Sequence, residues 1–248
     1  MDKYNEIVEE VIKQSDIVIE VLDARFPYES RNKEVEKNIK NRHKKLIYVL
    51  NKSDLIDGFI DDIQLDFEPY VFVSSKKNLG TTKLRKLIIS LIEKKPVQIG
   101  IVGYPNTGKS SLINVLKQRK SAKTSPKPGF TRGMQKIKIM EGIYLFDTPG
   151  VIPQRENNLM KHMLLNIKDV TTLKDPDVIV HRIITEFLHK DKKALETLYN
   201  IKIETSNPQE VLEMIALKFN WLVKGGRPNI DITSRRVIQD WQNGKLKI

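Results

Sequence analysis

Short runs of consecutive apolar residues recur in the first two thirds of the chain, and each run is followed by a polar or glycine-containing turn. Runs of this length that are rich in Val and Ile are typical of strands buried on both faces of a parallel sheet. One further segment alternates apolar and polar residues, as an edge strand does. The pattern predicts six strands, at residues 17–22, 45–50, 70–73, 97–102, 137–139 and 143–146.

Amphipathic segments with apolar residues at helical spacing separate several of these runs, and such segments alone fill the last third of the chain. Alternating strands and helices indicate an α/β fold with a mostly parallel sheet. We therefore expect an α/β domain over residues 1–155 and a small all-α domain over residues 156–248. The predicted helices are at 4–13, 32–41, 81–93 and 111–116 in the first domain, and at 158–167, 178–189, 194–199, 208–223 and 232–242 in the second.

A glycine-containing motif, Gly103 to Ser110, lies between the predicted strand 97–102 and the helix that follows it. It matches G-x-x-x-x-G-K-[ST], the phosphate-binding loop of nucleotide triphosphatases, in the strand–loop–helix context that this motif needs. The loop backbone and the helix N-terminus present N–H groups to phosphate, Lys109 reaches the β- and γ-phosphates, and Ser110 ligates Mg²⁺. The expected nucleotide contacts in this segment are Tyr104, Pro105, Asn106, Thr107, Gly108, Lys109, Ser110 and Ser111.

Two short motifs at the ends of predicted strands indicate that the base is guanine. Residues 51–54 fit N-K-x-D, in which the Asp54 carboxylate accepts paired hydrogen bonds from N1–H and N2–H₂ of guanine. Adenine lacks that pair of donors, which disfavours an ATPase. We expect Asn51 to orient the loop and meet the base edge, and the Lys52 stem to pack over the face of the base. A serine-rich turn is expected to place a backbone N–H at the guanine O6 atom, and it comprises Ser74, Ser75 and Lys76.

The remaining elements of a GTPase switch follow the phosphate loop. Thr131 lies in a turn-rich segment and is the expected switch threonine, closing on Mg²⁺ and the γ-phosphate. The last predicted strand ends in a D-x-x-G element, in which Asp147 holds a Mg²⁺-bound water and the N–H of Gly150 senses the γ-phosphate. Lys109, Thr131 and Gly150 are therefore the expected catalytic residues. The next residue, Val151, cannot hydrogen-bond the attacking water, so we expect slow hydrolysis without a partner.

The chain carries 43 Lys and Arg residues against 31 Asp and Glu, a net charge of +12 that favours a polyanionic partner. Residues 117–138, which follow the phosphate loop, contain basic residues and no acidic one. A second basic group lies near the last two predicted helices. A solvated lysine-rich surface is the alternative to RNA contact. The expected RNA contacts are Lys120, Lys123, Lys127, Arg132, Arg235 and Arg236.

The sequence also limits the kind of protein and its compartment. The chain has no cysteine, which excludes disulfides and thiolate metal sites. No apolar run reaches the roughly 20 residues that a membrane span requires. The N-terminus is too polar and acidic for a signal peptide. We expect a cytoplasmic monomer without a membrane partner.

The order of the motifs is rotated relative to the usual GTPase order, because the base-recognition motifs precede the phosphate loop. An open α/β domain tolerates such a permutation, since its termini lie close together. With this order of motifs, and with the segment Asp23 to Pro27, the sequence resembles the circularly permuted GTPases of the YlqF/YawG type over residues 1–155. The resemblance implies a P-loop GTPase fold and GTP hydrolysis coupled to maturation of the large ribosomal subunit.

The resemblance also implies ligands and partners. Asn106 occupies the position at which potassium-dependent GTPases of similar sequence bind K⁺, so we expect K⁺ as well as Mg²⁺. The C-terminal helices are expected to bind rRNA, and GTP, GDP and the large ribosomal subunit are the expected partners. Two alternatives stay open: a nucleotide-gated RNA-binding scaffold with negligible catalysis, and a GTPase that acts on tRNA or another RNA.

Overall fold

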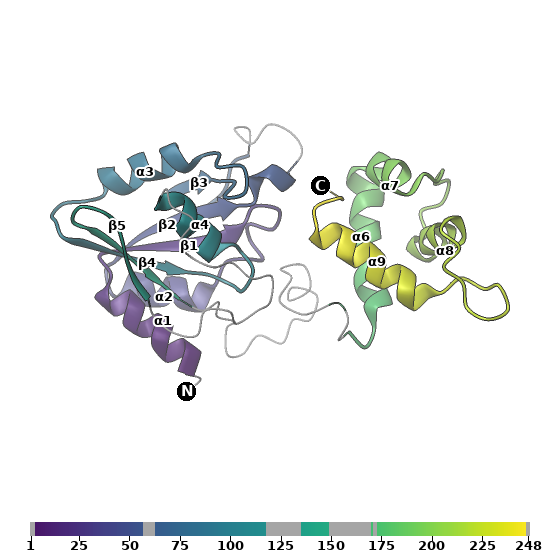
Figure 1. Cartoon of the computed structure of the whole chain (residues 1–248), viewed down its shortest axis with the longest axis horizontal. Coiled ribbons are helices and arrows are strands. Elements are labelled where there is room, and N and C mark those ends of the chain that lie inside the picture. The colour runs from purple at the N-terminus through teal and green to yellow at the C-terminus, as the bar shows by residue number, and fades with distance from the viewer. Residues whose placement is uncertain (1–2, 57–62, 118–134, 149–169, 171–172, 247–248) are drawn as a thin grey trace. The chain divides into compact units, whose positions relative to one another are not determined.

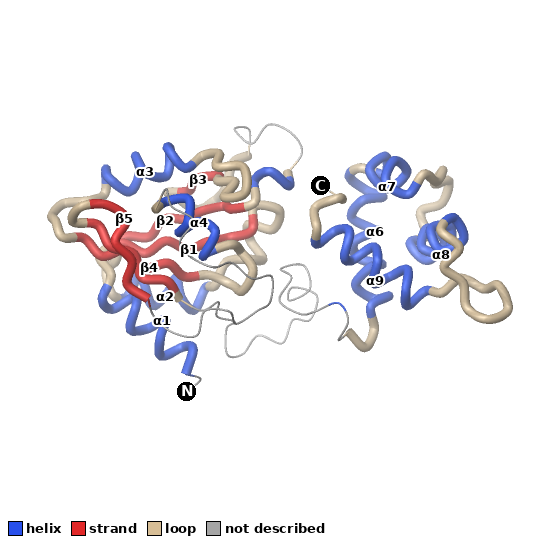
Figure 2. The backbone as a smooth tube through the Cα atoms, in the orientation of Figure 1, coloured by secondary structure: helices blue, strands red, loops and turns tan. Residues whose placement is uncertain are grey.

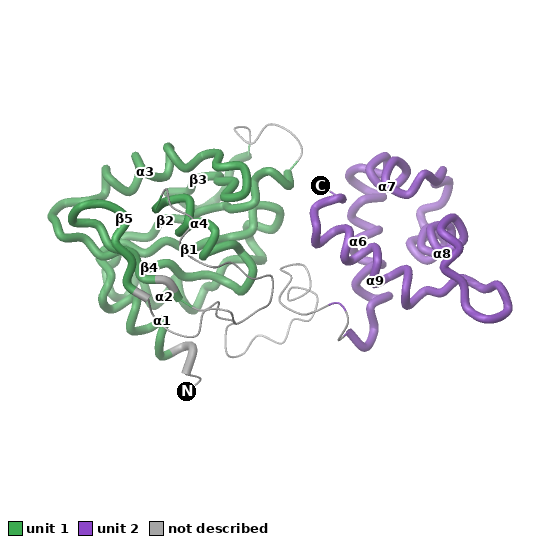
Figure 3. Tube along the Cα trace, in the orientation of Figure 1, with its two compact units in different colours: residues 1–161 green, residues 162–248 purple. Residues whose placement is uncertain are grey.

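The structure is a computed structural model, and it describes residues 3–56, 63–117, 135–148, 170 and 173–246. The chain divides into two compact units, residues 1–161 and residues 162–248 (Figure 3). The predicted domain boundary between residues 155 and 156 lies outside the described residues. Each unit has its own architecture, so the two are described separately.

The first unit is built on a single sheet, drawn as arrows in Figure 1 and in red in Figure 2. Its strands are β1 (Ile17–Asp23), β2 (Lys45–Asn51), β3 (Tyr70–Phe72), β4 (Val97–Val102), β5 (Gln135–Met140) and β6 (Ile143–Asp147). They lie in the order β3-β2-β1-β4-β6-β5, and every neighbouring pair is parallel except β5 with β6. The predicted α/β fold with a mostly parallel six-stranded sheet is confirmed.

Helices cover both faces of this sheet, which explains why its strands read as unbroken apolar runs. These helices are α1 (Lys3–Gln14), α2 (Lys33–Asn41), α3 (Thr81–Ser90) and α4 (Lys109–Leu116). α1 and α2 pack on the face that carries Val18 of β1, against which Ile12 is buried. α3 and α4 pack on the opposite face, where Leu84 and Leu112 lie in one core with Ile19. Neighbouring residues of β1 therefore belong to two different cores.

Strand β1 lies in the middle of the sheet, between the two halves that carry the predicted motifs. It pairs with β2 on one side, in a register that sets Asp23 opposite Asn51. On its other side it pairs with β4, with Ile19 opposite Ile101. Because all three strands are parallel, the loops after β1, β2 and β4 leave from the same edge of the sheet.

The second unit consists of helices in its described residues: α6 (Pro176–Lys190), α7 (Lys192–Tyr199), α8 (Pro208–Lys218) and α9 (Ile230–Gln242). Its core includes Phe187 and Trp241, whose rings meet edge to face with centroids 5.6 Å apart. The helix predicted at 158–167 lies outside the described residues. None of the helices in the described part of the chain combines the length and apolar content that a membrane span needs.

The structure corrects the ends of two predicted helices. Helix α3 ends at Ser90 and not at residue 93. Helix α8 ends at Lys218, whereas the apolar pattern extends the helix to Val223. Asn220 adopts a left-handed conformation with φ 54°, which breaks the helix. The chain then turns back through a short bridge between Leu222 and Pro228, so the apolar residues after Lys218 belong to a hairpin.

Candidate functional site

The phosphate-loop motif connects β4 to α4, as predicted, and the backbone requires glycine at both glycine positions of the motif. Gly103 and Gly108 have φ of 141° and 94°, a region that L side chains rarely adopt. A Cβ on Gly103 would lie 2.5 Å from the carbonyl oxygen of Val21, and a Cβ on Gly108 would lie 2.2 Å from Nδ2 of Asn51. Asn106, also in the loop, has φ of 62°. The loop is therefore pressed closely against β1 and the end of β2.

Lys109 lies at the centre of this loop. Its Nζ donates to the carbonyl oxygens of Gly103 and Tyr104, at 3.0 Å and 2.8 Å. The hydroxyl of Thr107 donates to the same carbonyl oxygen of Tyr104, at 3.0 Å. The Lys109 side chain is largely buried, and Tyr104 is fully buried. The loop thus curls around the ammonium group and holds it with backbone oxygens.

The other residues predicted for the phosphate and Mg²⁺ positions are only partly described. Pro105 is buried in the loop, and Ser110 and Ser111 are partly exposed in the first turn of α4. Asp147 ends β6, where its backbone pairs with Ile101 of β4. Thr131 and Gly150, like Val151, lie outside the described residues.

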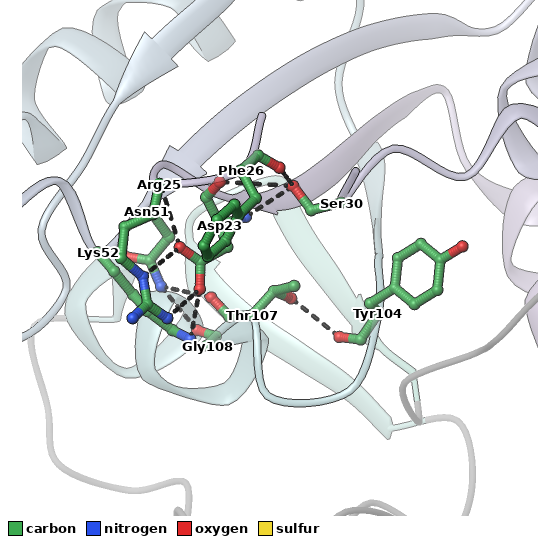
Figure 4. A network of polar contacts seen from close by, with 9 residues as sticks. All are labelled: Asp23, Arg25, Phe26, Ser30, Asn51, Lys52, Tyr104, Thr107 and Gly108. Atoms are coloured by element: carbon green, nitrogen blue, oxygen red, sulfur yellow. Dashed lines mark hydrogen bonds and ion pairs between the residues drawn. The ribbon is translucent and has the colours of Figure 1, made fainter. Parts of the chain in front are cut away.

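Asn51 joins the base-recognition motif to the phosphate loop. Its Nδ2 donates to the carbonyl oxygen of Thr107 at 2.9 Å, with a longer contact to that of Gly108 at 3.5 Å. Its Oδ1 accepts from both the backbone N–H and the hydroxyl of Ser75, at 3.1 Å and 2.9 Å. Asn51 is 2% exposed. Figure 4 shows the contact of Asn51 with the phosphate loop. With its bonds to Ser75, this one buried amide links three predicted loops that are far apart in the sequence.

Asp54 and the serine-rich turn form the second contact of the base-recognition side. The Ser74 hydroxyl donates to Oδ1 of Asp54 at 2.6 Å and accepts from the backbone N–H of Lys77 at 3.0 Å. A backbone bridge between Ser74 and Leu79 closes the turn. Lys76 is exposed at this turn. No described residue hydrogen-bonds the other oxygen of Asp54, Oδ2, so this carboxylate has one oxygen fixed by the protein.

The sequence indicates Asp23 and Arg25 only as part of a motif, without a role, yet they form a polar network around a fully buried carboxylate at this edge of the sheet. Arg25 donates from Nε to Oδ1 of Asp23 at 3.0 Å and from a terminal nitrogen to Oδ2 at 2.8 Å. Nζ of Lys52 donates to the same Oδ2 at 2.8 Å. Ser30 also donates to this segment, at the Phe26 carbonyl (Figure 4).

The two cations decide the protonation state of Asp23. Burial of this side chain alone would raise its pKa, because a charged carboxylate loses its hydration. The charges of Lys52 and Arg25 and their hydrogen bonds outweigh burial and hold the pKa of Asp23 well below its usual range. Asp23 is therefore ionised at neutral pH. An acidic residue directly after a buried strand, with an Arg two positions on, is the sequence signal that points to such a network.

The predicted RNA contacts divide into two groups. Lys120, Lys123, Lys127 and Arg132 lie outside the described residues. In α9, the Arg235 guanidinium donates to the carbonyl oxygens of Val170 and Leu173 and to the Asp231 carboxylate. Arg236, its neighbour in the same helix, is exposed. Arg235 thus has a structural role in the second unit, and Arg236 is the more accessible of the two.

The chain is similar in sequence to known GTP-binding proteins. The family model for the 50S ribosome-binding GTPases matches residues 98–214. An uncharacterized GTP-binding protein of Methanocaldococcus jannaschii is 38% identical over 97% of this chain and 65% of its own length. Nucleolar GTP-binding protein 2 of Neurospora crassa is 36% identical over 98% of this chain and 40% of its own length. The chain thus spans between 40% and 65% of the length of these two relatives.

Solved structures give the fold. GNP-bound YlqF from T. maritima matches with a TM-score of 0.63 at 22% identity, over 99% of this chain and 96% of that one. The chain has the YlqF fold. The resemblance to the circularly permuted YlqF-type GTPases, predicted from the motif order, is confirmed. The GDP-bound YlqF structure gives a TM-score of 0.65, again at 22% identity, over 97% of this chain and 95% of that one. In this fold β2 and β3, which lead into the predicted base-recognition motifs, precede the phosphate-loop strand β4 in the chain. In the sheet, β1 lies between β2 and β4.

Proposed function

We propose that this chain binds guanine nucleotides at the edge where β1, β2 and β4 end, hydrolyses GTP to GDP and phosphate, and acts as a switch in assembly of the large ribosomal subunit. The observation that carries the proposal is the buried Asn51 amide, which hydrogen-bonds both the phosphate loop at Thr107 and the guanine-recognition turn at Ser75. Motifs that the permutation separates by more than fifty residues thereby form one composite site.

In this site each half has its own task. On the base side, Asp54 accepts from N1–H and N2–H₂ of guanine, while the Ser74 hydroxyl donates to Oδ1 of Asp54 and holds the carboxylate in place. On the phosphate side, Lys109 exchanges its two backbone acceptors for phosphate oxygens when nucleotide enters. The energetic gain from this exchange favours bound triphosphate, because an ion pair to phosphate is stronger than hydrogen bonds to neutral carbonyls. Ser111 and the N-terminal N–H groups of α4 complete the anion site.

The residues at the phosphate side fit a Mg²⁺ ion. Ser110 offers a partly exposed hydroxyl in the first turn of α4, directly after Lys109. Together with Thr131 and Asp147 it makes an all-oxygen set, which is what Mg²⁺ prefers when phosphates and water supply the remaining ligands. When bound, Mg²⁺ neutralises charge on the transferring phosphoryl group. We assign these three residues to Mg²⁺ on this basis.

A potassium ion is proposed at Asn106. This residue lies in the phosphate loop with a left-handed backbone, φ 62°, so its side chain and the neighbouring carbonyls belong to one tight turn. A K⁺ ion there would supply positive charge to the transition state in place of an arginine finger. Lys109, Thr131 and Gly150 carry the catalytic roles, and Val151 leaves the attacking water to be positioned by a partner.

The ribosomal assignment rests on the relatives and on charge. The matching family model is named for 50S ribosome-binding GTPases, and a relative is named nucleolar GTP-binding protein 2. The net charge of +12 suits a partner made of rRNA. We propose phosphate contacts by exposed Arg236 and by Lys120, Lys123, Lys127 and Arg132, with residues 1–155 as the nucleotide domain and 156–248 as the RNA-binding domain of a cytoplasmic monomer.

The proposal is tested by GTP turnover in potassium and in sodium buffer, each with and without purified large ribosomal subunits. We expect stimulation by the subunits and a lower rate in sodium. Stimulation by tRNA but not by the subunits would select a GTPase that acts on another RNA. Slow turnover that is unchanged in all four conditions would contradict the switch and select a nucleotide-gated scaffold.

A further inference from the structure

The proposed function leaves one motif without a task, the segment Asp23 to Pro27. Asp23 is fully buried and lies opposite Asn51 in the register of β1 and β2. Its two carboxylate oxygens are engaged by Arg25 and Lys52, as Figure 4 shows. A buried ion network costs more desolvation than it returns unless its geometry is very good, so its presence beside a binding site needs an explanation.

Lys52 is the member of this network that lies beside the guanine-reading carboxylate. It is separated from Asp54 by a single residue, within a turn that Leu55 closes by donating to the Lys52 carbonyl. Burial lowers the pKa of Lys52, while the charge of Asp23 and, more weakly, that of Asp54 stabilise its ammonium form. The hydrogen-bonded partner of that ammonium is Asp23, at 2.8 Å. Two carboxylates thus compete for one cation, and the structure shows the cation on Asp23.

The partner of the Lys52 ammonium matters because it decides whether Asp54 is open to the base. With its ammonium on Asp23, Lys52 leaves Oδ2 of Asp54 without a hydrogen-bond donor among the described residues. With its ammonium on Asp54, that oxygen would be occupied by a cation that guanine N1–H or N2–H₂ must displace. A displaced ion pair lowers the net gain from each base contact.

We infer that Asp23 determines guanine specificity indirectly, by sequestering the Lys52 ammonium away from Asp54. Arg25 is the positioning residue that holds Asp23 for this purpose, through two parallel hydrogen bonds and a side chain that is 1% exposed. The inference rests on the proposed function, since it concerns how the same site reads guanine.

The geometry favours Asp23 as the holder of Lys52. Asp23 is fixed by β1, by the Arg25 fork and by the backbone N–H of Arg25 at 3.1 Å, so it cannot move toward another partner. Lys52 is held at φ 64°, a left-handed conformation that is costly for a residue with a side chain. Its flexible stem is therefore the part of the network that would reorganise if Asp23 lost its charge.

The test compares the full chain with the variants Asp23→Asn, Lys52→Met and the double variant, by calorimetric titration with GDP and with inosine diphosphate. Hypoxanthine lacks only the 2-amino group and keeps N1–H, so the ratio of the two affinities reports the contact between N2–H₂ and Asp54 and cancels the phosphate contacts. Lys52→Met keeps an apolar stem over the base and removes the competing cation. Loosening of the loop would instead weaken both nucleotides in parallel.

For Asp23→Asn we expect the GDP affinity to fall about 30-fold and the ratio of GDP to inosine diphosphate affinity to fall about tenfold, since a charge-assisted contact is lost. Adding Lys52→Met should restore the ratio to within about threefold of the native value. A lower ratio that the second substitution fails to restore would overturn the inference, and so would an unchanged ratio in Asp23→Asn.

Asp23→Asn removes the negative charge beside the buried Arg25 guanidinium and the partly buried Lys52 ammonium, which can prevent folding. In that case the ratio of GDP to inosine diphosphate affinity is compared between Lys52→Met and the double variant. Both variants lack the Lys52 cation, so Asp23 has nothing to hold away from Asp54 and its loss should not change the ratio. Equal ratios in these two support the inference, and a lower ratio in the double variant overturns it. If the native chain itself showed no preference for GDP over ADP, the proposed function would fail, whereas the outcomes above concern Asp23 only.

Discussion

The two halves of the site are held together in different ways. The base side is fixed by side chains from three segments: the Asp23 carboxylate with Arg25 and Lys52, and the Ser74 hydroxyl with Asp54. The phosphate side is fixed by backbone, with two glycines at positive φ and carbonyl oxygens around one lysine. The Asn51 side chain joins the two sides, because it hydrogen-bonds both the Thr107 carbonyl of the phosphate loop and the backbone N–H of Ser75.

The difference indicates which property each half controls. Side-chain networks with buried charges set up a rigid pattern of donors and acceptors, which suits the reading of a base. A backbone loop around a single cation presents positive charge and N–H groups to any triphosphate, whatever its base. Changes on the base side should therefore alter selectivity, and changes on the phosphate side should alter turnover.

The largest effect is expected from Lys109→Met. Loss of the cation that faces the transferring phosphoryl group should lower GTP turnover about 1000-fold, the scale of removing a main electrostatic contact. The preference for GDP over ADP should change little, because Lys109 is assigned to the phosphates and not to the base. Turnover at saturating GTP and the two affinities are measured, with exposed Lys86→Met as the matched control. A variant with native turnover would show that phosphate contacts are made elsewhere.

Asp54→Asn should produce the complementary result. The carboxylate that we propose to read N1–H and N2–H₂ is lost, so we expect the preference for GDP over ADP to fall about 100-fold. Turnover at saturating GTP should stay within about threefold of the native value. The exposed Asp66→Asn in the same unit is the control. A retained preference would contradict the assignment of Asp54 to the base.

Gly108→Ala acts where the two halves meet and should affect both. The new Cβ would lie 2.2 Å from Nδ2 of Asn51 at a φ of 94°. We expect GDP affinity to fall at least about tenfold and the free energy of unfolding to fall by about 2 kcal/mol.

Gly225→Ala is the control for this substitution, because Gly225 has φ of 95° but no heavy atom within 4 Å of an added Cβ. This variant has the backbone strain without the clash, so its free energy of unfolding should fall by only about 1 kcal/mol. Calorimetric titration with GDP and denaturant unfolding measure both quantities. If the two alanine variants lost the same stability and neither lost GDP affinity, the contact with Asn51 would be of no consequence for the site.

The smallest effect concerns Glu20, a second buried carboxylate three positions before Asp23 on β1. Its Oε1 accepts from the Asn32 N–H at 2.7 Å, and Oε2 has no hydrogen-bond partner among the described residues. Burial, with the charge of Glu36 adding to it, raises the pKa of Glu20 well above its usual range. Asp23 and Glu20 thus show opposite shifts, because only Asp23 has two cations beside it.

For Glu20 the sign follows from linkage. A folded-state pKa above the unfolded value means that the folded chain binds more protons, so stability is greatest below the unfolded pKa and falls as pH rises toward the folded one. Glu20→Gln removes this loss. Its free energy of unfolding, relative to that of the native chain, should therefore rise by about 1 kcal/mol between pH 5 and pH 8. Denaturant unfolding at the two pH values measures the difference. A gain that shrinks as pH rises would contradict a raised pKa for Glu20.

Much of the fold was predictable because its signals are local. Strands buried on both faces appear as apolar runs, and β1, β2, β3, β4 and β6 lie where the runs predict, with β5 at the alternating segment. The end of α8 was missed because a left-handed Asn220 stops a helix without interrupting the apolar pattern. The role of Arg235 as a clamp on the Val170 and Leu173 carbonyls was not visible either, since a basic residue on a helix carries no sign of its partner.

The candidate site was predictable as a set of motifs but not as a set of contacts. The phosphate loop and N-K-x-D carry fixed spacings, so their residues could be named from sequence. The bonds from Asn51 to Thr107 and from Lys52 to Asp23 join residues 56 and 29 positions apart, and only the register of β1 with its neighbours brings them together. Long-range pairing of this kind leaves no periodic trace in a single sequence.

The central claim is that one composite site in this chain reads guanine and binds phosphates together. Its most direct test is calorimetric titration of the full chain with GDP and with ADP, in the presence of Mg²⁺. The account predicts that GDP binds at least about 100-fold more tightly, or about 2.7 kcal/mol, because ADP would leave Asp54 without its two donors. Equal affinities for the two nucleotides, or no binding of either, would contradict it.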